Sequence, residues 1–151
     1  MISKARSRIW FLKRLKLLGA PIHMLIDVFK LYVRSRLEMA VPLWAGALTK
    51  KNIQDIELVQ VNCLQIIIGD RSHSYKQSLK ILGLDTLAKR RDKLCLKFAK
   101  KSVKNPRFSH WFPLRQAAET RSHKKYVEPK ANTKRFLTSS IPHLIRLMNS
   151  K

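Results

Sequence analysis

Residues 49–69, TKKNIQDIELVQVNCLQIIIG, decide the fold because they combine a helix start, a helical apolar pattern and a helix stop. Thr49 suits the N-cap position, and Gly69 is typical of the residue that ends a helix. The inward apolar side chains recur every three or four residues, at Ile53, Ile56, Val59, Cys63, Leu64 and Ile67. Leu58, Val61, Ile66 and Ile68 widen this arc. We therefore expect a helix over about 50–68 that is the central, most buried element.

Two further helices are expected on the N-terminal side. Ala5, Ile9, Leu12 and Leu15 form one stripe, and Gly19 suits the end of a helix over about 3–18. A second helix over about 22–40 carries apolar residues at the same spacing, with Asp27, Lys30, Arg34 and Glu38 on the opposite face. Residues 41–44, Val-Pro-Leu-Trp, break this second helix, and we expect Trp44 to be a packing residue.

Downstream, the pattern predicts a short helix over 75–82 and a long basic helix from Asp85 or Thr86 to about Val103. Residues 105–139 contain three prolines and little periodicity, so we expect an irregular tail, followed by a short helix after Ser140. The expected fold class is all-α. The expected domains are a small helical bundle over 1–104 and a loosely ordered basic tail over 105–151.

The charge of the chain indicates its partners. The 151 residues include 32 Lys and Arg against 9 Asp and Glu, a net charge of +23. Residues 49–85 are nearly neutral, whereas both flanking regions are strongly basic. Self-repulsion of this size favours an anionic partner, of which nucleic acid is the commonest and an acidic membrane surface the second.

Two cysteines, Cys63 and Cys95, lie within apolar helical patterns, so we expect buried free thiols and a reducing compartment. No uncharged run approaches the roughly 20 residues that span a bilayer, so no transmembrane segment is expected. The scarcity of acidic residues before Asp27 resembles a mitochondrial presequence. We nevertheless expect an intracellular location in the nucleus or cytoplasm, because the later basic regions need no such explanation.

No catalytic or metal site is expected, and no cofactor. Two-metal polymerase or nuclease chemistry requires clustered carboxylates, whereas the nine acidic residues are scattered. Asp55 and Glu57 point in different directions on a helix, and we expect them to pair with lysines or face water. The histidines and cysteines lack metal-ligand spacing, and no glycine-rich phosphate loop occurs.

Basic helical faces are the candidate binding residues. Lys89, Lys93, Lys97, Lys100 or Lys101, and Lys104 recur at three-to-four spacing, with Leu87, Leu94, Cys95 and Phe98 on the side expected to pack on the core. Such a stripe is often just a solvated face, but here it favours phosphate contact. The first helix adds Lys13 and Arg14 near Trp10 and Phe11, two aromatic residues that could stack on bases but are more often core.

The order of motifs resembles the region after the palm in reverse transcriptases of non-LTR retrotransposons, jockey-like elements above all. The matching pieces are FLKRLKLLGAP (11–21), LYVRSRLEMAVPLWAG (31–46), LTKKNIQDIELVQVNCLQIIIG (48–69), SYKQSLKILGLDTLAKRRDKLCLKFAKK (74–101) and TKRFLTSSIPHLIRLMN (133–149). The resemblance implies a thumb-like helical domain over residues 1–70 that grips a template–primer duplex, followed by a basic extension with the helix over 89–104.

The resemblance also implies a truncated fragment. The fingers, the palm with its metal-binding aspartates and the endonuclease of such an RNA-directed DNA polymerase do not occur among these residues, so no polymerase activity is expected. Met39 stands where these proteins often have an aromatic residue. Such elements often insert as 5′-truncated copies, so a remnant without function is an alternative.

The expected function is sequence-nonspecific binding to RNA, DNA or an RNA–DNA hybrid through phosphates. Two alternatives from other classes stay open. A membrane-surface module would place the basic first helix on anionic lipid. A helical interaction module would self-associate through an exposed apolar face of the second and third helices.

Overall fold

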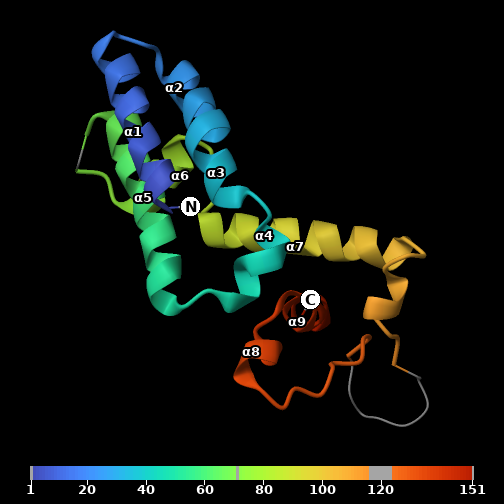
Figure 1. Ribbon diagram of the computed structural model, residues 1–151. Helices are drawn as coiled ribbons and strands as arrows, with labels where there is room; N and C mark the ends of the chain where they lie inside the picture. Colours follow the sequence, from blue (N-terminus) through green and yellow to red (C-terminus); the bar gives the residue numbers. More distant parts are fainter. Residues whose placement is uncertain (1, 71, 116–123, 151) are drawn as a thin grey trace. The chain divides into compact units, whose positions relative to one another are not determined.

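The computed structural model describes residues 2–70, 72–115 and 124–150 (Figure 1). Within these ranges the regular structure is helical, and the only extended pairing is an isolated bridge between Leu114 and Tyr126. The protein is therefore all-α, as expected. The chain forms two compact units, which we call the first unit (Met1–Met39 and Thr49–Arg90) and the second unit (Ala40–Leu48 and Arg91–Lys151).

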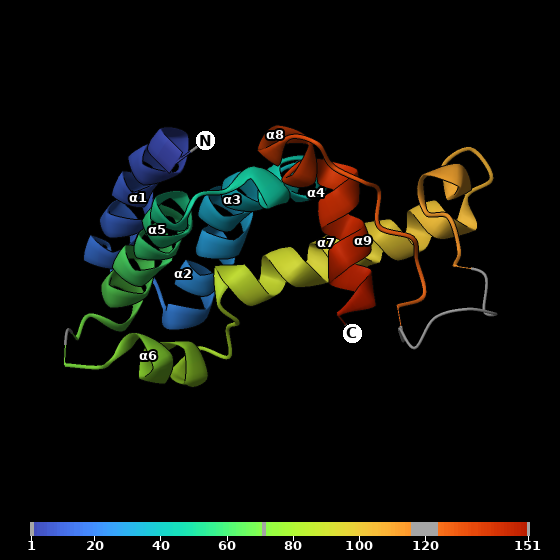
Figure 2. The ribbon, with the colours of Figure 1, turned by 90° about the horizontal axis from the view of Figure 1, so that it is seen from below.

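The first unit is a small helical bundle. It contains α1 (Ile2–Leu17), α2 (Ile22–Val28), the π-helix η1 (Phe29–Arg34), α3 (Ser35–Glu38), α5 (Lys50–Ile68) and α6 (Tyr75–Ile81). Helix α1 lies beside α5 and beside the run from α2 to α3 (Figure 1, Figure 2). The core of this unit includes Leu12, Leu25, Phe29, Val33, Leu37, Ile56, Val59, Leu64 and Ile67, all buried.

Helix α5 has the bounds that its sequence predicts. The Thr49 Oγ1 atom accepts a hydrogen bond from the Asn52 backbone N at 3.2 Å, which satisfies one of the free donors of the first turn. At the other end Gly69 has φ 82°, a left-handed conformation that a residue without Cβ adopts without strain. The predicted burial of Phe29, Ile56, Val59 and Leu64 is confirmed.

The helix expected over 22–40 contains a π-helical segment that its apolar spacing does not predict. Its buried residues Leu25, Phe29, Val33 and Leu37 lie four positions apart. In an ideal α-helix each step of four residues rotates the side chain by about 40° around the axis, so the stripe would drift away from the core. The wider π-helical turns of η1, with bonds between residues five apart, offset this drift.

The break after this helix differs from the expected one. The helix ends at Glu38, and Ala40 takes a left-handed conformation with φ 54°. The four residues expected to interrupt the helix form a short helix themselves, α4 (Val41–Trp44), with Pro42 in its first turn, where the missing N–H costs nothing.

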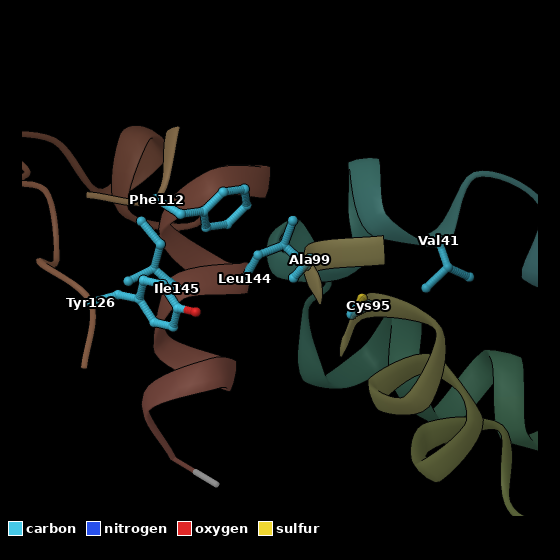
Figure 3. Close-up of a cluster of buried hydrophobic side chains, with 7 residues drawn as sticks. All are labelled: Val41, Cys95, Ala99, Phe112, Tyr126, Leu144 and Ile145. Carbon is cyan, nitrogen blue, oxygen red and sulfur yellow. The ribbon is translucent and has the colours of Figure 1, made fainter. Parts of the chain in front are cut away.

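The second unit has its own buried cluster. Its elements are α4, the 3-10 helices η2 (Ala45–Ala47) and η3 (Ser109–Trp111), α8 (Lys134–Leu137) and α9 (Ser140–Asn149). Helix α7 (Leu87–Lys104) begins in the first unit and contributes most of its residues to the second. Figure 3 shows the cluster, which consists of Val41, Cys95, Ala99, Phe112, Tyr126, Leu144 and Ile145. Trp44 packs against it while half-buried, as expected for a packing residue.

The close approach of α9 to residues 42–46 fixes a glycine in the second unit. A Cβ atom on Gly46 would lie 2.6 Å from the carbonyl oxygen of Thr138 and 2.7 Å from the Cβ of His143. The Ser140 hydroxyl donates to the Pro42 carbonyl oxygen at 2.8 Å in the same region. The backbone at Gly46 therefore packs directly against α9 and Thr138. Any side chain at position 46 would push α9 away.

The division of the chain differs from the expected boundary at residue 104. The segment expected to be an irregular tail supplies Phe112, Tyr126, Leu144 and Ile145 to the buried cluster. The Tyr126 backbone N and O bond to the Asn149 side chain, each at 3.0 Å, so an extended stretch is fastened to α9. These contacts join residues far apart in sequence, and a search for local periodicity does not detect them.

Both cysteines are buried free thiols, as expected. Burial raises the pKa of Cys63 to about 12 and that of Cys95 to about 11, because a thiolate would lose its hydration in these apolar surroundings. None of the helices in the described ranges is long and apolar enough to cross a membrane.

Candidate nucleic-acid interface

The start of α7 is fixed to α5 by a carboxylate. Glu57 accepts hydrogen bonds from the backbone N of Leu87 at 3.3 Å, from that of Ala88 at 2.6 Å and from the Tyr75 hydroxyl at 2.6 Å. A carboxylate at this position satisfies free N–H donors and faces the positive end of the helix dipole. Glu57, which the sequence predicted to pair with a lysine or face water, therefore acts as an N-terminal cap supplied by another helix.

Two further contacts hold this end of α7. The Thr86 hydroxyl accepts a hydrogen bond from the Lys89 backbone N at 3.2 Å. The Arg90 guanidinium binds both carboxylate oxygens of Glu38, with Nη2 2.9 Å from Oε2, and Arg34 lies 3.7 Å from the same carboxylate. Arg34 and Glu38, expected on a polar face, are thus mostly buried within an ion cluster. Burial and the Arg90 charge lower the pKa of Arg34, while Glu38 opposes this shift.

One side of α7 is buried. Leu87 is buried in the first unit, and Cys95 and Ala99 are buried in the second, where Leu94 and Val103 pack partly buried against the cluster. Phe98, expected to pack with them, is 38% exposed instead. The buried side fixes the helix's rotation and so determines which residues face solvent.

The other side carries the predicted cationic stripe. The side chains of its members are all exposed: Lys89, Lys93, Lys97, Lys100 and Lys104. Their spacing places them within less than a quarter of the helix circumference, along about 22 Å of its axis. Lys101 is also exposed, next to the stripe. Lys89 is 3.0 Å from the carboxylate of Asp85, so its charge is already partly compensated. The stripe continues beyond it through Lys93, Lys97, Lys100 and Lys104.

Such a stripe is electrostatically unfavourable in the absence of a partner. Neighbouring like charges cost about 0.2–0.5 kcal/mol per pair on an isolated helix, so the four consecutive pairs from Lys89 to Lys104 cost about 1–2 kcal/mol. Lys101 and Lys104 recover part of this, because they lie in the last turn at the negative end of the helix dipole. A polyanion alongside the stripe would relieve the remaining repulsion.

The other predicted residues, Lys13 and Arg14, lie on α1 in the first unit, and both are exposed. The Arg14 guanidinium carbon lies 5.5 Å from the centre of the Trp10 ring. Trp10 is 64% exposed, so the interpretation of this residue as core is wrong. Phe11 is also exposed and lies against Tyr32, with ring centres 5.6 Å apart.

Four further residues lie near Lys13 and Trp10, of which Arg6 and Lys16 belong to the basic set of the first helix and Asn62 and Gln65 were not predicted. Arg6 and Lys16 on α1, and Asn62 and Gln65 on α5, line the same groove of about 750 Å³ as Lys13 and Trp10. The α1 members follow from the sequence, where Arg6, Trp10, Lys13 and Leu17 recur at three-to-four spacing. The α5 members do not, since only the packing of the two helices brings them to this place.

The described ranges contain no group of three or more His, Cys, Asp or Glu side chains that could hold a metal ion. Comparisons with protein-family models, with curated proteins and with solved structures give no match for this chain. The candidate interface therefore rests on the charge, spacing and exposure of its own side chains.

Proposed function

We propose that this protein is a sequence-nonspecific nucleic-acid-binding module that holds RNA, DNA or an RNA–DNA hybrid by its phosphates. The observation that carries the proposal is the exposed lysine stripe of α7, whose opposite side is buried and whose first turn is capped by Glu57. Lysine presents a compact charge to phosphate oxygens and gives affinity without a choice of base.

We further propose that the module derives from the thumb and basic extension of a jockey-like reverse transcriptase. The sequence motifs quoted above support this origin, and a remnant without selected function is its alternative. In a complete enzyme the module would position the template–primer duplex while another domain performs the chemistry. Genomic DNA upstream of the Met1 codon tests the origin, because an intact or decayed palm-coding frame is expected there.

Fluorescence anisotropy with labelled duplexes tests the binding function. Two DNA duplexes of unrelated sequence and one RNA–DNA hybrid are expected to bind with similar affinity at low salt. Replacing Lys93, Lys97 and Lys100 by Gln together should weaken all three complexes by a similar factor, because the lost contacts are to phosphates. Unchanged affinity in the triple variant, or strong preference for one sequence, would contradict the proposal.

One observation favours a second candidate function, attachment to an anionic membrane surface. Leu17 and Leu18, at the end of the basic helix α1, are each 81% exposed. Apolar side chains beside Lys13 and Arg14 could enter the headgroup region of an acidic bilayer. Flotation of the protein with vesicles of neutral and of acidic lipid tests this candidate, which requires binding to the acidic vesicles alone.

A further inference from the structure

A groove between α1 and α5 within the first unit combines an exposed aromatic ring with cations and amides. It has a volume of about 750 Å³, and its lining includes Trp10, Lys13 and Lys16 from α1 and Asn62 and Gln65 from α5. The stripe on α7 contributes nothing to this lining. The groove is therefore a separate feature that phosphate contact along α7 does not explain.

Trp10 is the feature that selects the class of ligand. Its indole is largely exposed although it could bury a large apolar area, and it lines the groove. Arg14 lies over the same ring but not in the lining, so it holds the indole by a cation–π contact from outside the groove. The face of the indole that Arg14 does not cover can stack on another flat ring.

The charged side chains around the ring differ in their availability. Lys16 Nζ donates to the Ile67 carbonyl oxygen at 3.0 Å and so caps the end of α5. Arg6 lies 3.7 Å from Asp55. Within the described ranges Lys13 forms no ion pair, and its exposed ammonium lines the groove beside the ring. Lys13 is thus the residue that could bind a phosphate oxygen.

We propose that this groove binds an unpaired nucleotide of a single-stranded nucleic acid. The base stacks on Trp10, the adjoining phosphate lies on Lys13, and the exposed amides of Asn62 and Gln65 meet the edge of the base. Side-chain amides both donate and accept, so they can bond to any base without strong selection. In a duplex the bases stack on one another, so no base offers a free face to the Trp10 ring. This inference deepens the proposed function and assumes its polyanionic ligand, but adds a preference for single strands.

The test compares Trp10→Ala with the unchanged full-length protein on three probes of equal length. These are a single-stranded oligonucleotide of about ten nucleotides, the same strand with abasic sites, and the corresponding duplex. Loss of one stacked base should weaken single-strand binding roughly 5- to 150-fold, with little change for the abasic strand or the duplex. Trp10→Phe should restore part of the affinity, and Leu31→Ala, which removes a similarly exposed side chain of the first unit that does not line the groove, serves as the matched control.

The outcomes separate this inference from the proposed function. If Trp10→Ala binds all three probes like the unchanged protein while the α7 triple variant is weakened, the groove proposal is wrong and the phosphate-binding function stands. If neither variant differs from the unchanged protein, both fail. Equal weakening on the abasic and normal strands would mean that Trp10 does not stack on bases. If Trp10→Ala weakens binding to acidic vesicles in the flotation assay but binding to none of the three probes, Trp10 belongs to a membrane surface and the proposal is likewise overturned.

Discussion

At the scale of single residues, two neighbouring carboxylates on α5 have different roles. Asp55 forms a partly exposed ion pair with Arg6 at 3.7 Å, whereas Glu57 accepts three hydrogen bonds and caps α7. The sequence alone does not separate the two carboxylates, because their local patterns are alike. They differ because the tertiary fold places hydrogen-bond donors of residues 75, 87 and 88 beside Glu57 and not beside Asp55.

Glu57→Ala is therefore expected to destabilise the protein by about 1–3 kcal/mol, because it leaves backbone donors of α7 unsatisfied and removes a charge-assisted cap. Urea unfolding followed by circular dichroism measures the loss. Asp55→Ala is the matched control, and its effect should stay below about 0.5 kcal/mol, since exposed ion pairs contribute little. Equal losses from the two substitutions would show that Glu57 does not cap α7.

Residue burial was predictable where it follows a helical stripe and not where it depends on a neighbour. Ile56, Val59 and Cys63 are buried as their spacing predicts. Trp10 is exposed although large aromatic residues usually belong to a core, because its position on α1 faces the groove rather than the bundle. The spacing on α1 separates the two placements, because Trp10 shares a stripe with Arg6 and Lys13 and lies outside the buried stripe of Ala5, Ile9 and Leu12.

At the scale of elements, helix ends were predictable because they are determined by local chemistry. The cap at Thr49, the capping box of Ser74 with Gln77, and the left-handed Gly69 and Gly83 all lie where short motifs indicate them. The π-helical segment η1 and the helix α4 were not predictable in the same way. Both depend on how a run of apolar residues aligns with other parts of the fold, which a fixed period of 3.6 residues does not describe.

The central position of α5 gives a test at this scale. Ile56 is 1% exposed, and Ile56→Asp would bury an unpaired charge, so it should cost more than about 4 kcal/mol and unfold the first unit. Leu58 lies two residues further along the same helix and is 48% exposed. Leu58→Asp should therefore cost less than about 1 kcal/mol. Thermal unfolding of both variants measures the difference, and wild-type stability of Ile56→Asp would refute the packing of α5.

At the scale of the whole molecule, the net charge of +23 raises the question of specificity, since any strongly basic protein attracts polyanions. The two units divide the candidate residues between them: Lys13 and Arg14 belong to the first, and the stripe from Lys93 onward belongs to the second. Composition alone indicated an anionic partner. Composition could not show which lysines lie opposite the buried side of a helix. The structure of α7 gives this information.

We also expect that the purified chain neither extends primers nor cleaves nucleic acid. The reason is that the acidic residues are scattered in sequence, whereas these reactions use clustered carboxylates to hold divalent ions. Primer-extension and nicking assays with magnesium and with manganese measure this. Metal-dependent activity that co-purifies with the protein and disappears in Asp55→Asn would contradict the expectation.

The salt dependence of duplex binding tests the central claim most directly. Each phosphate neutralised by lysine contributes about −0.9 to the slope of log K against log salt, so a stripe of four or five lysines gives a slope near −4. Replacing Lys93, Lys97 and Lys100 by Gln should flatten the slope by about three contacts. The matched control replaces Lys125, Lys130 and Lys134 of the second unit, all exposed, by Gln. Lys124 is not used, because it pairs with Glu128 at 2.9 Å.

The stripe predicts a much flatter slope for the α7 triple variant and a nearly unchanged slope for the control, although both lose the same charge. Equal flattening in the two triple variants would show diffuse attraction by a highly basic protein and would contradict a specific role for the α7 lysines.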